Sequence, residues 1–219
     1  MDHPELRLFS RSAGTSKALV FIDGFLSENK DRRNNLLSAL NYAGWHHSIY
    51  HLWWEASSKS SAFGMDYHKC KIRAKSIGKE YLQSLIESEI TEQNISLLAH
   101  SLGARVAFDG IDNWKGNQHS IENVIFLSGA VRRDSSKNWG YVADKIKGKL
   151  INVYSYDDST LKKWFKIAEL GNACGRKPIK EYHPKIINED ATYFLGKDHN
   201  LSKPLEYLPE LVRKGLWCM

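Results

Sequence analysis

Five residues at positions 99–103, with the sequence Ala-His-Ser-Leu-Gly, could carry nucleophilic chemistry. An apolar run at 95–98 precedes them and is typical of a buried strand, and the run at 104–111 that follows is typical of a helix. In a sharp turn from strand to helix, the central residue is strained and its side chain is exposed at the carboxyl edge of the sheet. Small residues two positions away, here Ala99 and Gly103, let the neighbouring backbones pass closely. We therefore expect Ser101 to be a nucleophile.

An N-cap is the alternative role for Ser101, because serine is among the residues favoured at the start of a helix. A serine hydroxyl alone is a weak nucleophile, and it needs a histidine base together with a carboxylate that orients the imidazole. In hydrolases with such a turn, the acid follows the nucleophile along the chain and the histidine follows the acid. The sequence after residue 101 therefore decides between the two roles.

Two adjacent acids, Asp157 and Asp158, follow an apolar run at 150–154 that is typical of a strand. We favour Asp158 as the acid of a Ser-His-Asp triad. Either carboxylate could instead cap the helix expected from Thr160, or lie in its first turn. Two neighbouring acids can fill both roles.

His199 is the expected base, because it follows the last strand-like run, at 185–187, and precedes the terminal helix. Two other histidines compete for this role. His183 comes before that run, and His100 is next to the nucleophile, where its side chain is expected to point away from Ser101. The alternative for His199 is an ordinary surface-loop histidine.

Two backbone N–H groups, those of Leu102 and Phe25, are expected to stabilise the oxyanion of a tetrahedral intermediate. Phe25 follows Gly24 as the chain leaves the strand-like run at 18–23, although an ordinary turn explains Gly24 equally well. Apolar side chains near this point could form an acyl pocket: Phe25, Leu26, Trp53, Trp54 and Trp139. Aromatic residues at strand ends belong to the core as often.

Strand-like and helix-like segments alternate along the whole chain. Strands are expected at 5–10, 18–23, 48–53, 95–98, 124–127, 150–154 and 185–187, and helices at 29–42, 67–90, 104–111, 139–147, 160–170 and 205–214. This alternation predicts a mostly parallel, doubly wound α/β sheet with helices on both faces and with chemistry at the carboxyl ends of its strands. The loops at 54–65 and 171–180 are too short for a large cap, so we predict a minimal cap domain or none.

Length and composition fit one α/β domain over residues 1–219. Of the 219 residues, 42% are hydrophobic, which allows one sizeable core. No apolar run approaches the roughly 20 residues that span a bilayer, and the mean hydropathy is −0.46. Because residues 1–11 mix acidic and basic side chains, we expect no signal peptide and a cytoplasmic location, with export by a dedicated secretion system left open.

Neither metal nor nucleic-acid chemistry is expected. Three scattered cysteines, Cys70, Cys174 and Cys218, fit a reducing compartment, and the histidines at 46, 47 and 51 lack metal-ligand spacing. We predict no cofactor. The net charge of +6 is spread thinly and comes without a nucleic-acid-binding motif. The expected partner is a small-molecule or lipid ester, with weak contact to an anionic membrane left open and partner proteins unassigned.

Several longer segments carry a resemblance to a known family: FIDGFL at 21–26, LWWE at 52–55, LAHSLGARV at 98–106, LSGA at 127–130 and NVYSYDDSTL at 152–161. They resemble the little-characterised lipase-like α/β-hydrolases that, in eukaryotes, include the transmembrane and coiled-coil domain proteins, and that occur in bacteria as short forms. In that family the acid lies three positions before a leucine, which selects Asp158. The chain departs from the family at Ala99, where glycine is usual, and in the two residues inserted between Gly196 and His199.

The resemblance implies an α/β-hydrolase fold and a serine esterase that cleaves carboxylic esters, including lipid or phospholipid acyl esters. Two rivals remain. A non-catalytic binding module on the same fold predicts that Ser101, Asp158 and His199 lie out of mutual reach. An amidase or acyltransferase would keep the triad, because the triad alone does not choose the leaving group or the acceptor.

Overall fold

The computed structural model describes residues 3–27, 30–57, 63–115 and 118–218. Seven strands form one sheet in the order β1-β3-β2-β4-β5-β6-β7. They are β1 (Glu5–Ser10), β2 (Lys17–Ile22), β3 (Ser48–Trp53), β4 (Asn94–His100), β5 (Ser120–Leu127), β6 (Leu150–Tyr154) and β7 (Ile186–Asp190). β1 pairs with β3 in the antiparallel sense, and every other pair of neighbours is parallel. The predicted mostly parallel, doubly wound sheet is confirmed.

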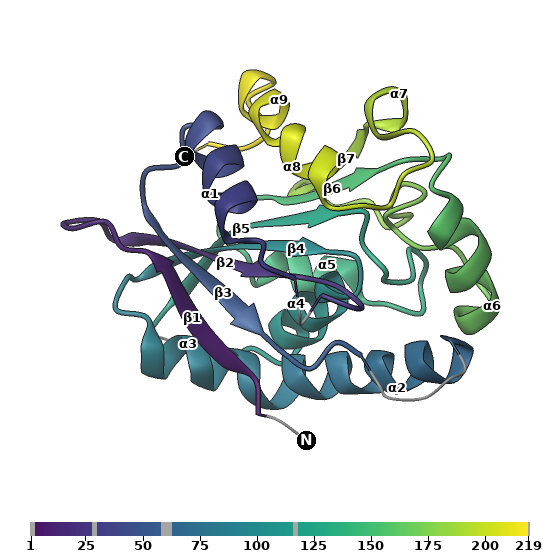
Figure 1. The fold of residues 1–219 in the computed structure, drawn as a ribbon, viewed down its shortest axis with the longest axis horizontal. Coiled ribbons are helices and arrows are strands. Elements are labelled where there is room, and N and C mark those ends of the chain that lie inside the picture. The colour runs from purple at the N-terminus through teal and green to yellow at the C-terminus, as the bar shows by residue number, and fades with distance from the viewer. Residues whose placement is uncertain (1–2, 28–29, 58–62, 116–117, 219) are drawn as a thin grey trace.

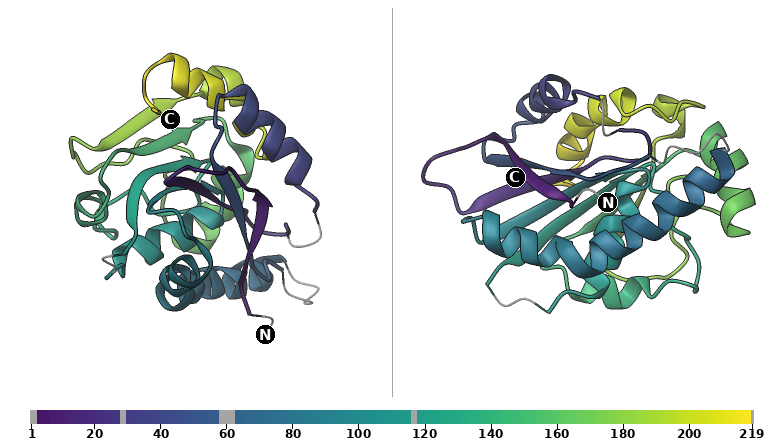
Figure 2. Two further views of the ribbon diagram at one scale, coloured as in Figure 1. Left: turned by 90° about the vertical axis from the view of Figure 1, so that its left-hand side faces the viewer. Right: turned by 60° about the horizontal axis from the view of Figure 1, so that its bottom comes forward.

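Helices cover both faces of this sheet (Figure 1). One face carries α1 (Arg33–Tyr42), α7 (Thr192–Leu195), α8 (Ser202–Glu206) and α9 (Leu208–Arg213). The other carries α2 (Phe63–Ser76), the π-helical η1 (Ile77–Leu82), α3 (Gln83–Glu89), α4 (Gly103–Asp112) and α5 (Trp139–Asp144). The π-helical η2 (Leu161–Phe165) and α6 (Lys166–Glu169) lie near the start of α2. Figure 2 shows α2, η1 and α3 as one long helix along its face of the sheet.

Residue types explain why the central strands are central. In β2 the residues Ala18 to Ile22 are all fully buried, because helices cover the sheet on both sides, and their sequence is accordingly an unbroken apolar run. β1, in contrast, is an edge strand whose side chains are exposed or only half-buried. Among the described residues, every helix is too short or too polar to cross a bilayer.

Most predicted elements are present, with shifted ends. β1, β3 and β6 have the predicted bounds. The helix predicted at 29–42 begins only at Arg33, with residue 29 outside the described residues, and the helix predicted at 67–90 begins at Phe63 and contains a π-helical stretch. The loop predicted from residue 54 gives way to α2 at Phe63, and its residues 58–62 lie outside the described residues.

In the second half of the chain, two predicted helices differ in detail from the structure and one element was missed. The helix predicted at 160–170 is π-helical in its first part, and α7 was not predicted, because four residues are too few for an apolar period to show. The single terminal helix predicted at 205–214 is two helices, α8 and α9. Pro209 lies in the first turn of α9, where its missing N–H is tolerated, and a regular helix cannot run through it.

Candidate active site

Ser101 lies at the tight turn between β4 and α4, and its backbone is left-handed, with φ of 51°. Two backbone hydrogen bonds fix it: its N–H donates to Leu127 O at 3.0 Å, and its carbonyl accepts from Ala130 N at 2.8 Å. The turn also packs tightly against the end of β2. A Cβ at Gly103 would lie 2.2 Å from the Ile22 carbonyl oxygen, so only glycine fits there. This is the strained, closely packed turn expected from the sequence.

The Ser101 hydroxyl contacts His199, which contacts Asp158. The Ser101 Oγ–His199 Nε2 distance is 2.8 Å, and the His199 Nδ1–Asp158 Oδ2 distance is 2.6 Å. Asp158 is fully buried, whereas its neighbour Asp157 is exposed. The rival arrangement, with the three side chains out of reach of one another, is therefore absent. The N-cap alternative for Ser101 does not hold either, because the N-cap position of α4 is Leu102 and makes no side-chain cap bond.

Asp158 divides its two carboxylate oxygens between two tasks. Oδ2 accepts from His199, while Oδ1 accepts from the Leu161 N–H at 2.8 Å, at the start of η2. The sequence suggested that two adjacent acids would share the triad and capping roles. In the structure one carboxylate takes both, which orients it firmly and accounts for its complete burial without an unpaired oxygen.

The loop that carries His199 is held by serines from the other side of the site. Ser155 Oγ donates to Gly196 O at 2.6 Å, and Ser159 Oγ donates to Lys197 O at 3.0 Å. The rival histidine, His183, lies elsewhere and contacts Asp144 through its Nε2 at 3.1 Å. Both serine contacts involve the loop that departs from the family pattern, so the inserted residues are tied to the acid segment.

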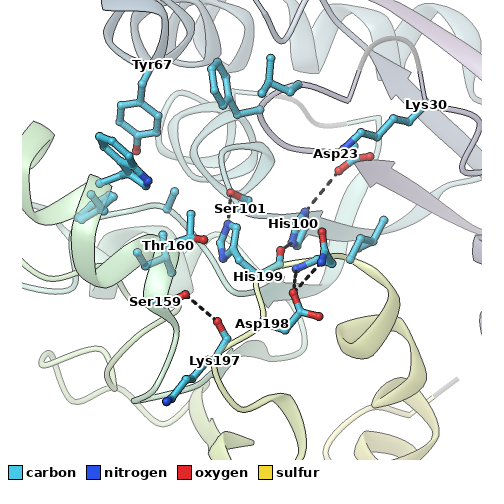
Figure 3. Close-up of a pocket in the computed structure, with 18 of the residues that line it drawn as sticks. Asp23, Lys30, Tyr67, His100, Ser101, Ser159, Thr160, Lys197, Asp198 and His199 are labelled. Carbon is cyan, nitrogen blue, oxygen red and sulfur yellow. Dashed lines mark hydrogen bonds and ion pairs between the residues drawn. The ribbon is translucent and has the colours of Figure 1, made fainter. Parts of the chain in front are cut away.

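His100 lies behind the triad, between Asp23 and the backbone of His199 (Figure 3). Its Nε2 is 3.2 Å from His199 O, and its Nδ1 is 3.4 Å from Asp23 Oδ1. Burial lowers the pKa of His100 and is the largest influence on it; the contact with Asp23 raises that pKa, the neighbouring His199 lowers it, and the net result is a pKa below the ordinary value. Burial alone would raise the pKa of Asp23, but His100, the Gly24 N–H and Arg32 outweigh it and hold that pKa below its ordinary value. His100 and the Asp23 carboxylate therefore support the His199 backbone from behind.

The two proposed oxyanion donors come from neighbouring backbone segments. The Cβ that Gly24 lacks would lie 2.8 Å from Ser101 Cβ and 3.3 Å from Leu102 N, so the exit of β2 runs directly beside the nucleophile. Leu26, just after Phe25, is left-handed with φ of 61°, and its N–H donates to Ala56 O at 2.9 Å. This fixed turn holds the Phe25 backbone in the wall of the site.

A cavity of about 310 Å³ opens at Ser101 and His199. Its apolar lining is formed by Phe25, Leu26, Tyr67, Ala130, Leu161, Trp164, Phe165 and Leu201. Its polar lining includes Asp23, Lys30, Arg32, Ser159, Thr160, Lys197, Asp198 and Asn200. A cavity of this size and mixed character is typical of a small-molecule site.

Of the residues proposed for the pocket, Phe25 and Leu26 line the cavity, whereas the three tryptophans lie elsewhere. Trp54 is buried in the core and donates from Nε1 to Asp23 O at 3.0 Å, and the Arg7 guanidinium lies over the Trp53 ring. Trp139 packs against Phe108 in the core. None of the three lines the described part of the cavity.

Besides Phe25, three aromatic residues in the described part of the chain line the cavity: Tyr67 from α2, and Trp164 and Phe165 from η2. Their helices were predicted, but helical periodicity gives no sign of which residue at a helix start faces a strand end. Among the described residues, no group of three or more His, Cys, Asp or Glu side chains lies close enough together to hold a metal ion.

A sequence model of the family described as "Protein of unknown function (DUF726)" matches residues 22–211. A Caenorhabditis elegans protein described as an uncharacterized membrane protein is 31% identical over 136 residues, which make up 58% of this chain and 22% of that protein. The chain thus spans about a fifth of the length of this curated relative.

Two solved structures are similar in fold. The lipase-esterase related protein from Clostridium acetobutylicum has a TM-score of 0.51 at 11% identity, covering 96% of this chain and 98% of its own. Mouse alpha/beta hydrolase domain-containing protein 10 has a TM-score of 0.52 at 9% identity, covering 96% of this chain and 92% of its own. At such identities the likeness concerns the fold alone, and that fold is the α/β-hydrolase fold.

Proposed function

The chain belongs to the DUF726 family, and for this member we propose the activity of a serine hydrolase that cleaves carboxylic esters. The observation that carries the proposal is the continuous contact from Ser101 Oγ through the His199 imidazole to a fully buried Asp158, at a strained turn that opens into a cavity. Core packing alone gives no reason to hold a serine in this strained conformation against a histidine–carboxylate pair.

In the proposed mechanism, His199 Nε2 takes the proton of Ser101 as the serine oxygen attacks the ester carbonyl. Asp158 accepts from His199 Nδ1 and stabilises the imidazolium that forms. The N–H groups of Phe25 and Leu102 stabilise the oxyanion, and the proton then passes from His199 to the leaving alcohol. Water, activated by the same histidine, hydrolyses the acyl-enzyme and regenerates the serine.

The cavity lining supports an ester with an apolar acyl group. The lining includes apolar residues such as Phe25, Leu161 and Phe165, which would cover an acyl chain, together with polar residues such as Lys197 and Asn200, close to His199 in the chain. Acyl esters of lipids or phospholipids combine an apolar acyl chain with a polar head, and so match both kinds of lining.

Labelling with a fluorophosphonate probe tests the proposal. Wild-type protein is expected to be labelled and Ser101→Ala is not. Ser128→Ala is the matched control, because Ser128 is also a buried, left-handed serine at the end of a strand but lies outside the triad. Hydrolysis of p-nitrophenyl esters with short and long acyl chains, with p-nitroanilides alongside, then defines the substrate class.

The outcomes separate the rivals. Labelling that is lost only in Ser101→Ala, together with ester hydrolysis, supports the esterase. A folded wild type that is neither labelled nor active on esters or anilides points to a binding module. Cleavage of anilides in preference to esters would indicate an amidase.

A further inference from the structure

The segment at 161–170, made of η2, α6 and Leu170, exposes apolar side chains on its outer face. Ile167 is 68% exposed and Leu170 is 89% exposed. Its inner face is ordinary, because Leu161 and Phe165 are buried against the core and the cavity. Isolated exposed apolar residues are common on protein surfaces, but these two are on one short segment that also carries the half-exposed Trp164.

The same segment carries three exposed lysines. Lys162, Lys163 and Lys166 are exposed on the same segment, and the Lys163 ammonium lies over the Trp164 ring. The acid of the segment, Glu169, adds no exposed negative charge, because it pairs inward with Arg105 and Lys71. We call the exposed side chains Lys162, Lys163, Lys166, Ile167 and Leu170 the outer face.

The outer face is held in place beside the cavity. The Glu169–Arg105 ion pair, at 2.7 Å, ties α6 to α4, and Asp158 Oδ1 holds the start of η2. Trp164 belongs both to this segment and to the cavity lining. The apolar side chains therefore cannot simply turn inward, and whatever covers them also lies next to the mouth of the site.

We propose that the outer face docks the protein on an anionic lipid bilayer, with the cavity mouth close to the membrane. Apolar side chains flanked by lysines are what an interfacial helix presents, since the apolar groups enter the boundary of the acyl chains while the ammonium groups meet anionic headgroups. Two acids belong to the surroundings of this face: Asp157 is exposed on the preceding loop, and Asp198 lines the cavity, as do Lys30 and Lys197.

Docking itself does not require catalysis. Docking would let an acyl ester in the membrane reach Ser101 without crossing water, and this consequence rests on the proposed function. The two claims can therefore fail separately.

Vesicle co-sedimentation tests the docking, with vesicles of phosphatidylcholine alone and of equal parts phosphatidylcholine and phosphatidylglycerol. Wild type is expected to bind the anionic vesicles and to be released by salt, which screens the lysines. The double variant Lys163→Gln/Lys166→Gln is expected to weaken partitioning more than about ten-fold, since each lysine contributes about five-fold. Ile167→Ser/Leu170→Ser is expected to weaken it at least as much.

The control variant is Tyr42→Ser/Lys147→Gln. Like the outer-face variants it changes two exposed side chains, here one aromatic residue and one lysine, but at the other end of the strands, where α1 ends and β6 is about to begin. It is expected to bind like wild type. Ser101→Ala is expected to bind like wild type as well, and Ile167→Ser/Leu170→Ser is expected to hydrolyse short water-soluble esters normally.

Equal binding by the outer-face variants, the control and the wild type would overturn the docking proposal, and so would no binding to anionic vesicles. So would wild type that sediments as a dimer through Ile167 and Leu170 without binding vesicles, because the partner would then be a second copy. Vesicle binding without fluorophosphonate labelling would overturn the esterase and leave the docking standing.

Discussion

At the scale of single residues, Asp158 is the side chain on which the site most depends. Both of its oxygens are used, one by His199 and one by the N–H of Leu161, and it is fully buried. An amide in its place could present an N–H where the imidazole now donates, and the tautomer of His199 would then be wrong for a base.

We predict that Asp158→Asn lowers kcat for p-nitrophenyl butyrate by about 10⁴-fold with a small change in KM. The matched control is Asp157→Asn, which removes the same charge from the exposed neighbour and is expected to leave kcat within about two-fold of wild type. Steady-state kinetics check both. Comparable losses of kcat in the two variants would contradict the assignment of Asp158 as the acid of the triad.

Residue types and spacing predicted the three side chains that meet at this site, because a nucleophilic serine has few workable partners and the fold orders them along the chain. The tryptophans show where this reasoning ends. Trp53 and Trp54 lie at the end of β3, as Phe25 lies just after β2, yet Trp53 lies beneath Arg7 and Trp54 is buried. Which aromatic residue faces a cavity depends on the direction of its side chain at the end of a strand. The neighbouring residues in the sequence do not determine that direction.

At the scale of elements, the exit of β2 and the turn after β4 are built as a pair. Gly24 faces the turn so closely that a Cβ would lie 2.8 Å from Ser101 Cβ and 3.1 Å from His100 O. A single methyl group must therefore push the oxyanion segment away from the nucleophile.

We predict that Gly24→Ala lowers kcat by about 100-fold, because a displacement of about 1 Å at the reacting groups has an effect of that size. The free energy of unfolding should fall by about 1–3 kcal/mol through overpacking. Kinetics and urea denaturation measure the two effects. Gly14→Ala is the control: its positive φ should cost about 1 kcal/mol, while kcat stays unchanged. A kcat loss in both variants would attribute the effect to general destabilisation.

Elements with long apolar runs or clear helical periods were predictable. The apolar residues of β2, β4 and α4 are the ones that the sheet and its covering helices bury, so the sequence pattern and the burial agree. The elements that surround the site were less so. The π-helical turn of η2 depends on Asp158, Leu161 and the core beneath them, and the break before α9 depends on Pro209. Such effects come from tertiary contacts or from one residue, and the periodicity of apolar residues along a helix does not reveal them.

At the scale of the whole molecule, burial of imidazoles makes stability depend on pH. His51 lies between the rings of Phe9 and Phe21, and burial lowers its pKa to about 4. The unfolded chain, with a value near 6.5, then binds more protons between these two pH values. The stability is therefore present above about pH 6.5 and is lost as pH falls towards about 4.

We predict that the free energy of unfolding falls by about 2 kcal/mol between about pH 7 and about pH 5 because of His51 alone. His100, whose pKa burial also lowers, adds to the fall in the same direction. Urea denaturation of wild type and of His51→Gln at both pH values measures the share of His51. The variant should be less stable at the higher pH but should lose less on acidification, and an equal loss in both proteins would contradict the assignment.

The two roles of Asp158 limit how this molecule can be re-engineered. The carboxylate that accepts from the first N–H of the 161–170 segment is also the one that contacts His199. A chimera that exchanges this segment with a relative's must therefore be joined after Leu161, so that Asp158 and the N–H it accepts from stay together. A crossover placed before Asp158 would transplant the entrance wall and the acid as one module, and activity would depend on how well the donor's acid meets the recipient's His199.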